Sequence, residues 1–368
     1  MKILIVNDYV DKTIGGVEIY MHQLYKLLVD RGHEVRITGG VAREAGAFRR
    51  FVFGWFSLKY KRLIGKQIRE FKPDVIWAQS IVYNISPSFL LEAKKKKVPV
   101  ILKLPNIDSY SYPKVNLTGS YRVLTFMKRL LHRNLVRKYV DFYIAPSENS
   151  ANWLNHYLGV MNVRVIRNPV FWEVSDHVRE STGSAKRIVY VGMLEWYKGI
   201  DYLIKAFPII CEKLPDDDVF LDIIGDGGDL KRLQKLAAGK NLYGKVNFKG
   251  YIPHEQLKEE YAGAYVFVLP SVIVENAPIA PLESMSQGTP VVTTNLGGQA
   301  ELVENGYNGF LVKPGDVHDL ADKIIAILAN SELRREMSKN SIEFAQRFSA
   351  EKHCTEIENF LLEVINTK

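Results

Sequence analysis

The chain has 368 residues, and its 49 basic and 41 acidic side chains give a formal net charge of +8. A hydrophobic fraction of 47% with 11% aromatic residues excludes a disordered protein. The charge is unevenly divided, because residues 1–170 carry 28 basic and 12 acidic side chains, a net +16, whereas residues 171–368 carry a net −8. The length exceeds that of one ordinary core and predicts two domains of roughly 170 to 200 residues.

The cysteines and the N-terminal sequence favour a cytoplasmic protein. Cys211 and Cys354 form neither a disulfide framework nor a metal-ligand spacing. The first apolar run, residues 3–6, is too short for a signal peptide, and no stretch approaches the ~20 apolar residues that cross a bilayer. We therefore expect any contact with a membrane to be peripheral, on its cytoplasmic face.

Short β-branched runs alternate with helical patterns along the chain, which is typical of parallel βαβ units covered on both faces. We expect two doubly wound α/β domains at residues 1–170 and 187–345, a polar linker at 171–186, and a C-terminal helix at 346–368 that can return to the first domain. The expected strands are residues 3–6, 35–38, 74–77, 98–102, 142–145 and 163–166, followed by 188–191, 220–224, 246–248, 265–269, 290–294 and 310–312.

The first strand-to-helix loop carries the glycine pair Gly15 and Gly16. Such a pair lets the backbone approach a ligand closely and directs free N–H groups at an anion. A flexible turn without a ligand explains the pair equally well.

Two later strand-to-helix loops carry candidate phosphate contacts. Gly225 and Gly227 follow an apolar strand, but a dinucleotide fingerprint needs a third glycine where Leu230 stands, which disfavours an NAD(P) oxidoreductase. A loop that contacts a phosphate or a base stays open there. Lys198, beside Gly199, is placed to reach a phosphate as a point charge, with a solvated surface lysine as the alternative.

Residues 275–283 contain two carboxylates and two prolines. Pro278 and Pro281 forbid a continuous helix, so we expect Glu275 in a loop and Pro281 in the first turn of a new helix, with Glu283 inside that turn. Free N–H groups at the helix N-terminus would bind a diphosphate, and a carboxylate would accept both hydroxyls of a ribose. Alternatively, Glu283 complements the helix dipole and Glu275 is solvated.

In their order and spacing these motifs resemble the retaining glycosyltransferases of family 4, which have the GT-B fold. The resemblance spans nearly the whole chain. It implies an α/β fold class with two Rossmann-like domains facing across a cleft, the first binding the acceptor and the second the donor, with C-terminal helices crossing back to the first. The motifs that carry it are residues 15–18, 73–76, 146–148, 168–170, 190–199, 225–227, 275–283, 288–292 and 297–301.

The resemblance implies a hexosyltransferase-like enzyme with a nucleotide-sugar donor site. Lys198 would hold the diphosphate, Glu275 would lie beside the donor sugar, and these two would be the catalytic residues, while Glu283 would bind the ribose hydroxyls. Gly15 and Gly16 would cover the diphosphate from the other domain. The remaining expected contacts are Gly225 and Gly227, Tyr251 and Ile252 beside the base, and Asn276, Ala277, Pro278 and Ile279 beside the sugar and phosphate.

The resemblance also implies that the leaving phosphate deprotonates the acceptor on the same face, so the stereochemistry is retained. Positive charge and N–H dipoles would stabilise the departing diphosphate without a metal ion. We therefore expect no cofactor and no metal site.

The sequence departs from the family pattern at two places, and the first of them, Met193, leaves an alternative function open, although we expect an active enzyme because Lys198 and the glutamate pair remain. Met193 stands where the family usually has an arginine that clamps the diphosphate, so half of the clamp is missing unless Arg167, Lys103 or another basic residue substitutes. A histidine that touches the sugar is also missing, with Asn106 and Asp108 as candidates in its place. The alternative is a catalytically weak nucleotide-sugar-binding partner subunit of a glycan-assembly complex.

The basic first half predicts an anionic partner. Residues 49–62 are basic and aromatic, residues 94–97 are four lysines, and basic side chains recur on one side of a helix expected at 120–139. Because the resemblance places the acceptor in this domain, we expect a glycan or lipid-linked acceptor at an anionic membrane surface. The alternative is a solvated basic face. No nucleic acid is expected, because no known binding module occurs.

Overall fold

The computed structural model describes residues 1–8, 16–40, 57–81, 85–103, 120–178, 185–240, 242 and 244–367. The chain divides into two compact units, Met1–Arg167 with Glu351–Lys368, and Asn168–Ala350. Gly15, Asn106, Asp108 and residues 49–56, to which the sequence assigned roles, lie outside the described residues.

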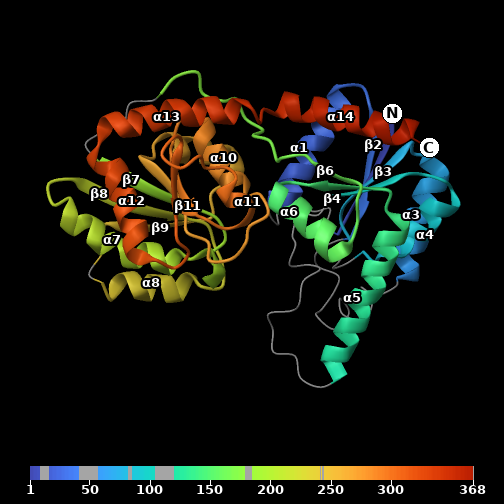
Figure 1. The fold of residues 1–368 in the computed structure, drawn as a ribbon, viewed down its shortest axis with the longest axis horizontal. Helices are drawn as coiled ribbons and strands as arrows, with labels where there is room; N and C mark the ends of the chain where they lie inside the picture. Colours follow the sequence, from blue (N-terminus) through green and yellow to red (C-terminus); the bar gives the residue numbers. More distant parts are fainter. Residues whose placement is uncertain are drawn as a thin grey trace. The chain divides into compact units, whose positions relative to one another are not determined.

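Unit 1 is a parallel six-stranded sheet of order β2-β1-β3-β4-β5-β6 with helices packed on it (Figure 1). Its strands are β1 (Lys2–Asn7), β2 (Glu34–Gly39), β3 (Val75–Ser80), β4 (Val100–Lys103), β5 (Phe142–Ala145) and β6 (Val163–Val165). Its helices are α1 (Gly16–Asp30), α3 (Leu58–Phe71), η2 (Pro87–Phe89), α4 (Leu90–Lys95), α5 (Ser120–Tyr139), α6 (Glu148–Trp153), η4 (Leu154–Leu158) and α14 (Ala350–Asn366).

Local chemistry explains where the elements of unit 1 begin and end. The apolar residues Ile3 to Val6 of β1 are almost fully buried, as expected for a central parallel strand. The Ser57 hydroxyl accepts a hydrogen bond from the Tyr60 N–H at 3.3 Å and so caps α3, which ends at Lys72 in a left-handed conformation.

Helix α14 packs within unit 1, although the whole of unit 2 precedes it in the sequence. Its apolar side, including Ile357, Leu361 and Val364, is buried. Polar contacts add to this packing, because Arg31 at the end of α1 donates to Glu358 at 2.6 Å and Arg164 of β6 donates to Glu363 at 2.7 Å. The unit boundary lies between Ala350 and Glu351, five residues beyond the position expected from the sequence.

Unit 2 is a second parallel six-stranded sheet, of order β12-β11-β10-β7-β8-β9. Helix α7 packs with α8 and α12, and α10 packs with α9 and α13 (Figure 1). Its strands are β7 (Ala185–Val191), β8 (Asp218–Ile224), β9 (Val246–Gly250), β10 (Val266–Leu269), β11 (Val291–Thr294) and β12 (Gly309–Val312). Its helices are η5 (Trp196–Lys198), α7 (Ile200–Lys213), α8 (Leu230–Ala238), η6 (His254–Gln256), α9 (Leu257–Ala262), α10 (Ile279–Ser286), α11 (Gly297–Ala300), α12 (Val317–Ala329) and α13 (Ser331–Gln346).

Val170 and the first residues of the expected linker pack on unit 2, whereas the last two residues of that linker, 185 and 186, begin strand β7. Val170 bridges to Ser349, the Ser175 N–H donates to the Ser286 carbonyl at 2.8 Å, and Trp172 lies against the core of this unit. The α/β fold with two parallel doubly wound sheets is confirmed. In the part of the chain that the structure describes, no helix combines the length and the apolar character needed to span a membrane.

Candidate active site

The strand order of unit 2 identifies where a ligand site is expected. From β7 the chain proceeds to β8 and β9 on one side of the sheet, and then to β10, β11 and β12 on the other. β7 and β10 are therefore neighbours at the point where the order reverses, and ligands of such sheets bind beyond the carboxyl ends of the strands at this point. The loop after β7 carries Lys198, and the loop after β10 carries Glu275.

Lys198 and Glu275 form an ion pair across these two loops. Lys198 Nζ lies 2.6 Å from Glu275 Oε1, and the two side chains are 14% and 16% exposed. The Ser271 hydroxyl donates to the same Oε1 at 2.8 Å, and the Glu275 N–H donates to the Gln299 side chain at 3.1 Å. Neither residue is a solvated surface group, and the contacts hold Glu275 in a defined orientation beside a lysine.

Glycines allow the loops of this site to approach one another. A Cβ at Gly199, where φ is +71°, would lie 2.0 Å from the Pro270 carbonyl oxygen of the loop after β10. A Cβ at Gly225 would lie 1.9 Å from the Gly192 carbonyl oxygen, and one at Gly227 would lie 2.4 Å from that of Leu194. Contact between backbones therefore requires Gly225 and Gly227, whether or not a ligand also touches them.

Helix α10 has Pro281 in its first turn, as expected, but not Glu283. It begins at Ile279 after Pro278 as N-cap, so Pro281 is the third residue of the first turn and Glu283 lies in the second turn. The expectation that Glu283 lies in the first turn is wrong. A proline at the third position costs no helical hydrogen bond, because the N–H that another residue would have there has no partner within the helix. Pro278 provides no side-chain cap, so the N–H groups of Ile279 and Ala280 face the end of the helix as donors for an anion.

Glu283 is buried and held by two side chains. His254 Nε2 lies 2.6 Å from Glu283 Oε1, and the Tyr261 hydroxyl donates to Oε2 at 3.1 Å. The His254 ring stacks on Trp172, with ring centroids 4.6 Å apart and planes 16° apart. Burial lowers the pKa of His254, but the hydrogen bond and negative charge of Glu283 outweigh this effect and raise it above its ordinary value. Sequence reasoning missed His254, Tyr261 and Trp172, although His254 closely follows the predicted contacts Tyr251 and Ile252.

The other predicted donor contacts lie in the loop after β9 and in the loop between β10 and α10, and Met193 lies in the loop after β7. Asn168 donates to the Ala277 carbonyl at 2.9 Å and so fixes the loop before α10, in which Asn276 is buried. Tyr251 is 70% exposed, whereas Ile252 packs partly on the core. The Met193 side chain is 54% exposed, and its carbonyl accepts a hydrogen bond from the Tyr190 hydroxyl at 2.8 Å.

In unit 1, Gly16 opens α1, and an added Cβ there would meet nothing within 4 Å. Lys103, a suggested substitute for the missing arginine, is only 1% exposed and lies 3.8 Å from the centroid of the Tyr20 ring. Burial lowers the pKa of Lys103 to about 7. A lysine this deeply buried does not offer a surface charge to a diphosphate, which argues against this substitution.

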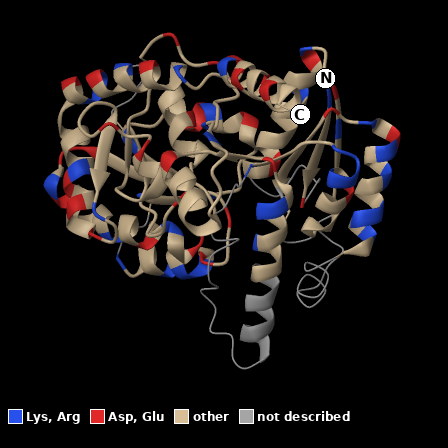
Figure 2. Cartoon of the chain, turned by 45° about the vertical axis from the view of Figure 1, so that its right-hand side comes forward, with Lys and Arg blue, Asp and Glu red and all other residues tan. Residues whose placement is uncertain are grey.

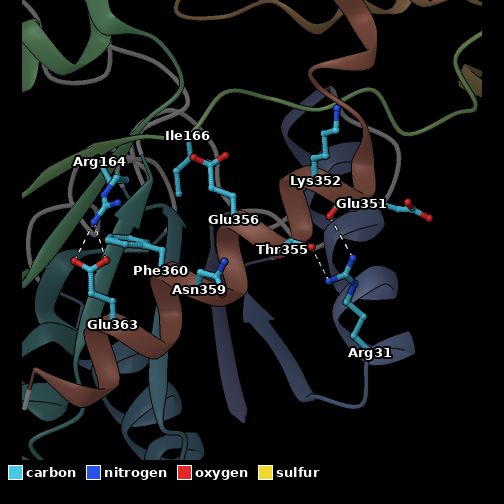
Figure 3. A pocket seen from close by; sticks show the side chains of 10 residues that line it. All are labelled: Arg31, Arg164, Ile166, Glu351, Lys352, Thr355, Glu356, Asn359, Phe360 and Glu363. Carbon is cyan, nitrogen blue, oxygen red and sulfur yellow. Dashed lines mark hydrogen bonds and ion pairs between the residues drawn. The ribbon is translucent and has the colours of Figure 1, made fainter.

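Unit 1 also has a pocket of about 600 Å³ along α14 (Figure 3). Both of its arginines have partners, because Arg31 donates to Thr355 and Glu358, and Arg164 donates to both oxygens of Glu363. Its described lining includes none of the residues predicted for the donor site.

The two doubly wound parallel sheets and the similarity to solved structures over the whole chain identify a GT-B type of α/β protein. The Lys198–Glu275 pair lies where the strand order of the second sheet reverses. Two family models match the chain, "Glycosyltransferase Family 4" over residues 14–171 and "Glycosyl transferases group 1" over residues 175–344. The chain belongs to this glycosyltransferase family and is a glycosyltransferase enzyme.

Individual relatives agree with this assignment. An uncharacterized glycosyltransferase of Methanocaldococcus jannaschii is 31% identical, and the match covers 96% of this chain and 95% of the relative. The sulfoquinovosyl transferase of Arabidopsis thaliana is 27% identical over 82% of this chain, which spans only 59% of the length of that relative. Among solved structures, Anabaena Alr3699/HepE in complex with UDP-glucose has a TM-score of 0.74 at 19% identity, covering 99% of this chain and 100% of that one.

Proposed function

We propose that the protein is a retaining, metal-independent glycosyltransferase that moves a sugar from a nucleoside-diphosphate sugar to a glycan or glycolipid acceptor. The observation that carries the proposal is the Lys198–Glu275 pair, at 2.6 Å, between the loops after β7 and β10. The similarity of the fold to a protein crystallised with UDP-glucose supports a nucleotide-sugar donor.

The roles follow from the chemistry of the leaving group. A departing diphosphate gains negative charge, which a fixed ammonium group and free N–H groups at a helix N-terminus stabilise. Lys198 and the first turn of α10 supply such groups, and the three donors of the ammonium allow Lys198 to bind a phosphate while it contacts Glu275. Glu275 lies beside the donor sugar, and Glu283, further along α10, accepts the ribose hydroxyls.

Retention of stereochemistry and independence of metal belong to the same proposal. In the described part of the chain, no three His, Cys, Asp or Glu side chains gather as a metal-binding group. We expect sugar transfer or donor hydrolysis to be unchanged by EDTA. Loss of activity with EDTA and its recovery with Mg²⁺ or Mn²⁺ would refute this part.

The acceptor is proposed to lie at an anionic membrane surface on the cytoplasmic side, contacted by unit 1. Helix α3 exposes Lys59, Arg62, Lys66 and Arg69 together with the apolar Leu63. Figure 2 shows in blue where basic residues occur along the described helices. Basic groups near a surface of anionic lipid contribute about 1 kcal/mol each. We expect flotation with vesicles that contain phosphatidylglycerol but not with pure phosphatidylcholine vesicles, and the variant K59E/R62E/K66E should lose it. Equal binding to both kinds of vesicle would refute the proposal.

Donor chemistry is tested with UDP, GDP and ADP sugars. Thermal stabilisation by one class of donor, followed by release of its nucleoside diphosphate, is expected. A protein that binds none of the three classes and hydrolyses none would refute the proposed function.

The second candidate function is that of a catalytically weak nucleotide-sugar-binding partner subunit of a glycan-assembly complex. The exposed Met193 at the end of β7 favours it, because a thioether cannot replace the hydrogen bonds of an arginine to a diphosphate. The variant M193R should tighten donor binding if the site is intact, with M161R, at an 88% exposed position of unit 1, as the matched control. A wild-type protein that binds the donor without turnover would favour the partner subunit.

A further inference from the structure

Two side chains, His254 and Tyr261, contact Glu283, and the family resemblance predicted neither of them. Its two carboxylate oxygens have different partners, because Oε1 contacts His254 Nε2 at 2.6 Å and Oε2 accepts from the Tyr261 hydroxyl at 3.1 Å. A carboxylate only accepts hydrogen bonds, so the contact with His254 requires a proton on Nε2. Each oxygen has about two acceptor positions, and the described contacts occupy one on each.

A carboxylate held in this way is preorganised to accept hydrogen bonds from the two hydroxyls of a vicinal diol. Its two remaining acceptor positions, one per oxygen, match the two hydroxyls of a ribose, and two fixed donors stop the carboxylate from rotating. The side chains of His254 and Glu283 are 15% and 8% exposed, so water competes little for these bonds. A preorganised site avoids the entropic cost of fixing the carboxylate when the ligand arrives.

His254 is itself held through one face of its ring. Its ring stacks on Trp172, whose Nε1 donates to the Ser286 hydroxyl at 2.8 Å, and Ser286 lies on the same helix α10 as Glu283. The segment just after the unit boundary is thereby tied to the helix that bears the carboxylate. Without this stacking partner, the imidazole of η6 could adopt other rotamers.

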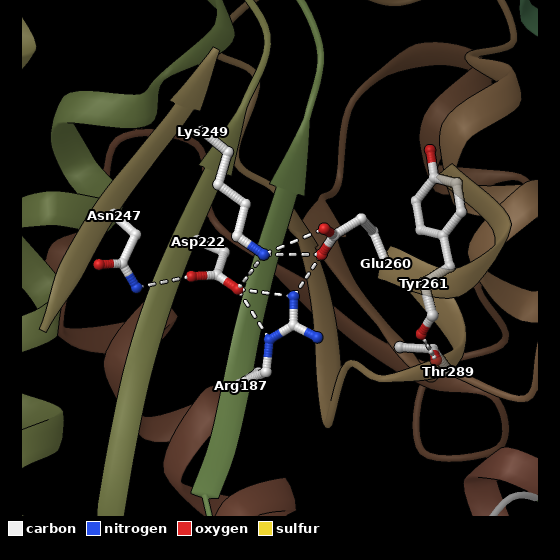
Figure 4. Close-up of polar contacts among 7 residues, drawn as sticks. All are labelled: Arg187, Asp222, Asn247, Lys249, Glu260, Tyr261 and Thr289. Atoms are coloured by element: carbon white, nitrogen blue, oxygen red, sulfur yellow. Dashed lines mark hydrogen bonds and ion pairs between the residues drawn. The ribbon is translucent and has the colours of Figure 1, made fainter. Parts of the chain in front are cut away.

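Tyr261 is fixed through its helix α9 (Figure 4). Glu260, the preceding residue, pairs with Arg187 of β7 and with Lys249 of β9, which lies 2.9 Å away, while the Tyr261 carbonyl accepts from the Thr289 hydroxyl at 2.6 Å. Ion pairs of the Glu260 side chain and a hydrogen bond to the Tyr261 main chain therefore hold this short helix. The position of the Tyr261 hydroxyl is set by the sheet and not by the ligand.

We propose that His254, supported by Trp172, is a positioning residue that fixes Glu283 for a ribose diol and so determines the preference for ribonucleotide over deoxyribonucleotide donors. The proposal rests on the proposed function, in which Glu283 binds the ribose. The raised pKa of His254 agrees with it, since Glu283 on α10 and Glu255 on η6 both favour the protonated ring.

The test is the ratio of dissociation constants for UDP and 2′-deoxy-UDP, measured by titration calorimetry, with ADP and GDP and their 2′-deoxy forms used in the same way. A hydrogen bond from a hydroxyl to a carboxylate corresponds to roughly a tenfold to hundredfold preference for the ribonucleotide. We expect this preference in the wild-type protein, its loss in E283Q, and a fall to below about threefold in H254F, which keeps an aromatic ring but has no donor.

A matched pair of variants separates positioning from a loss of folding. Glutamine places an amide N–H near the position of Nε2, whereas asparagine places it near Nδ1, so H254Q should keep the preference and H254N should lose it. The exposed His318 supplies the control H318F, which should keep the wild-type ratio.

The outcomes are distinguishable. Loss of the preference in E283Q but not in H254F or H254N would overturn the positioning role and leave the ribose assignment of Glu283 intact. Equal weakening of both nucleotides in H254F would also overturn it, because the ratio would then be unchanged. A wild-type protein without any preference, or E283Q with the wild-type preference, would overturn the ribose assignment and the positioning role together.

Discussion

Replacement of Gly225 by alanine tests whether the glycines of the loop after β8 are required by backbone contact. The new Cβ would lie 1.9 Å from the Gly192 carbonyl oxygen, and real Cβ contacts essentially never fall below 3.0 Å. The two loops would have to separate. Their separation would disturb the hydrogen bonds from the Gly225 N–H to the Gly250 carbonyl at 2.8 Å and from the Gly192 N–H to the Ile224 carbonyl at 3.0 Å.

The expected cost follows from these losses. Two backbone hydrogen bonds contribute about 1 kcal/mol each, and an alanine at φ +133° adds strain of about 1–3 kcal/mol, so G225A should lose about 3–5 kcal/mol. For a unit of this size, the melting temperature of unit 2 should fall by about 10 °C. The control is G244A, where φ is +75° and nothing lies within 4 Å, with an expected cost of about 1–2 kcal/mol.

Differential scanning fluorimetry and urea unfolding of both variants measure the difference. If G225A and G244A lost the same stability, the argument from the close approach of Gly192 would be refuted. If G225A were as stable as the wild type but failed to bind the donor, the glycine would serve the ligand and not the packing.

Three further predictions concern single side chains. G16A should leave the melting temperature unchanged, because nothing lies within 4 Å of the added Cβ. If Gly16 contacts the diphosphate, the variant should bind the donor about tenfold more weakly. Unchanged donor binding would remove Gly16 from the site. The pKa of Lys103 is about 7 in the folded protein and 10.5 in the unfolded chain, so between these pH values the unfolded chain binds more protons. The free energy of unfolding should therefore rise by about 1.4 kcal/mol for each unit of increasing pH in this range. K103M should abolish this rise in urea unfolding at pH 7, 8 and 9, and parallel slopes for both proteins would contradict the buried position. The pKa of His254 is raised, so its ion pair with Glu283 should stabilise the protein fully below pH 6.5, and this stabilisation should be lost as the pH rises through the raised pKa. The difference in free energy of unfolding between wild type and H254Q should therefore shrink at higher pH. A difference that does not depend on pH would count against the ion pair.

The sequence predicted every strand of both sheets. Buried parallel strands such as Ile3 to Val6 are short continuous apolar runs, and these runs stand out between polar loops and amphipathic helices. The sequence also placed Lys198 and Glu275 in loops that follow strands, but it did not predict that these two loops meet. The observed strand order, with β7 beside β10, brings them together.

The details of the site were less predictable. The sequence correctly placed Pro281 in the first turn of α10, but proline is tolerated throughout that turn and so does not fix the first residue of the helix. Because the helix starts at Ile279, Glu283 lies in the second turn and not in the first. The contacts of Glu283 with His254 and of His254 with Trp172 join residues distant in the sequence, and no local pattern specifies such pairs. The glycines at 225 and 227 indicated a ligand loop, whereas the structure gives them a packing role that depends on a neighbouring loop.

The central claim is that the Lys198–Glu275 pair belongs to a working glycosyl-transfer site. Its most direct test is the release of nucleoside diphosphate from the preferred nucleotide sugar by wild type, E275Q and E304Q, with donor binding measured on the same proteins. Glu304 is a 51% exposed carboxylate of unit 2 and serves as the control. We predict that E275Q retains donor binding within about threefold but loses at least about a hundredfold in turnover, whereas E304Q behaves as wild type. Wild-type turnover in E275Q would contradict the claim.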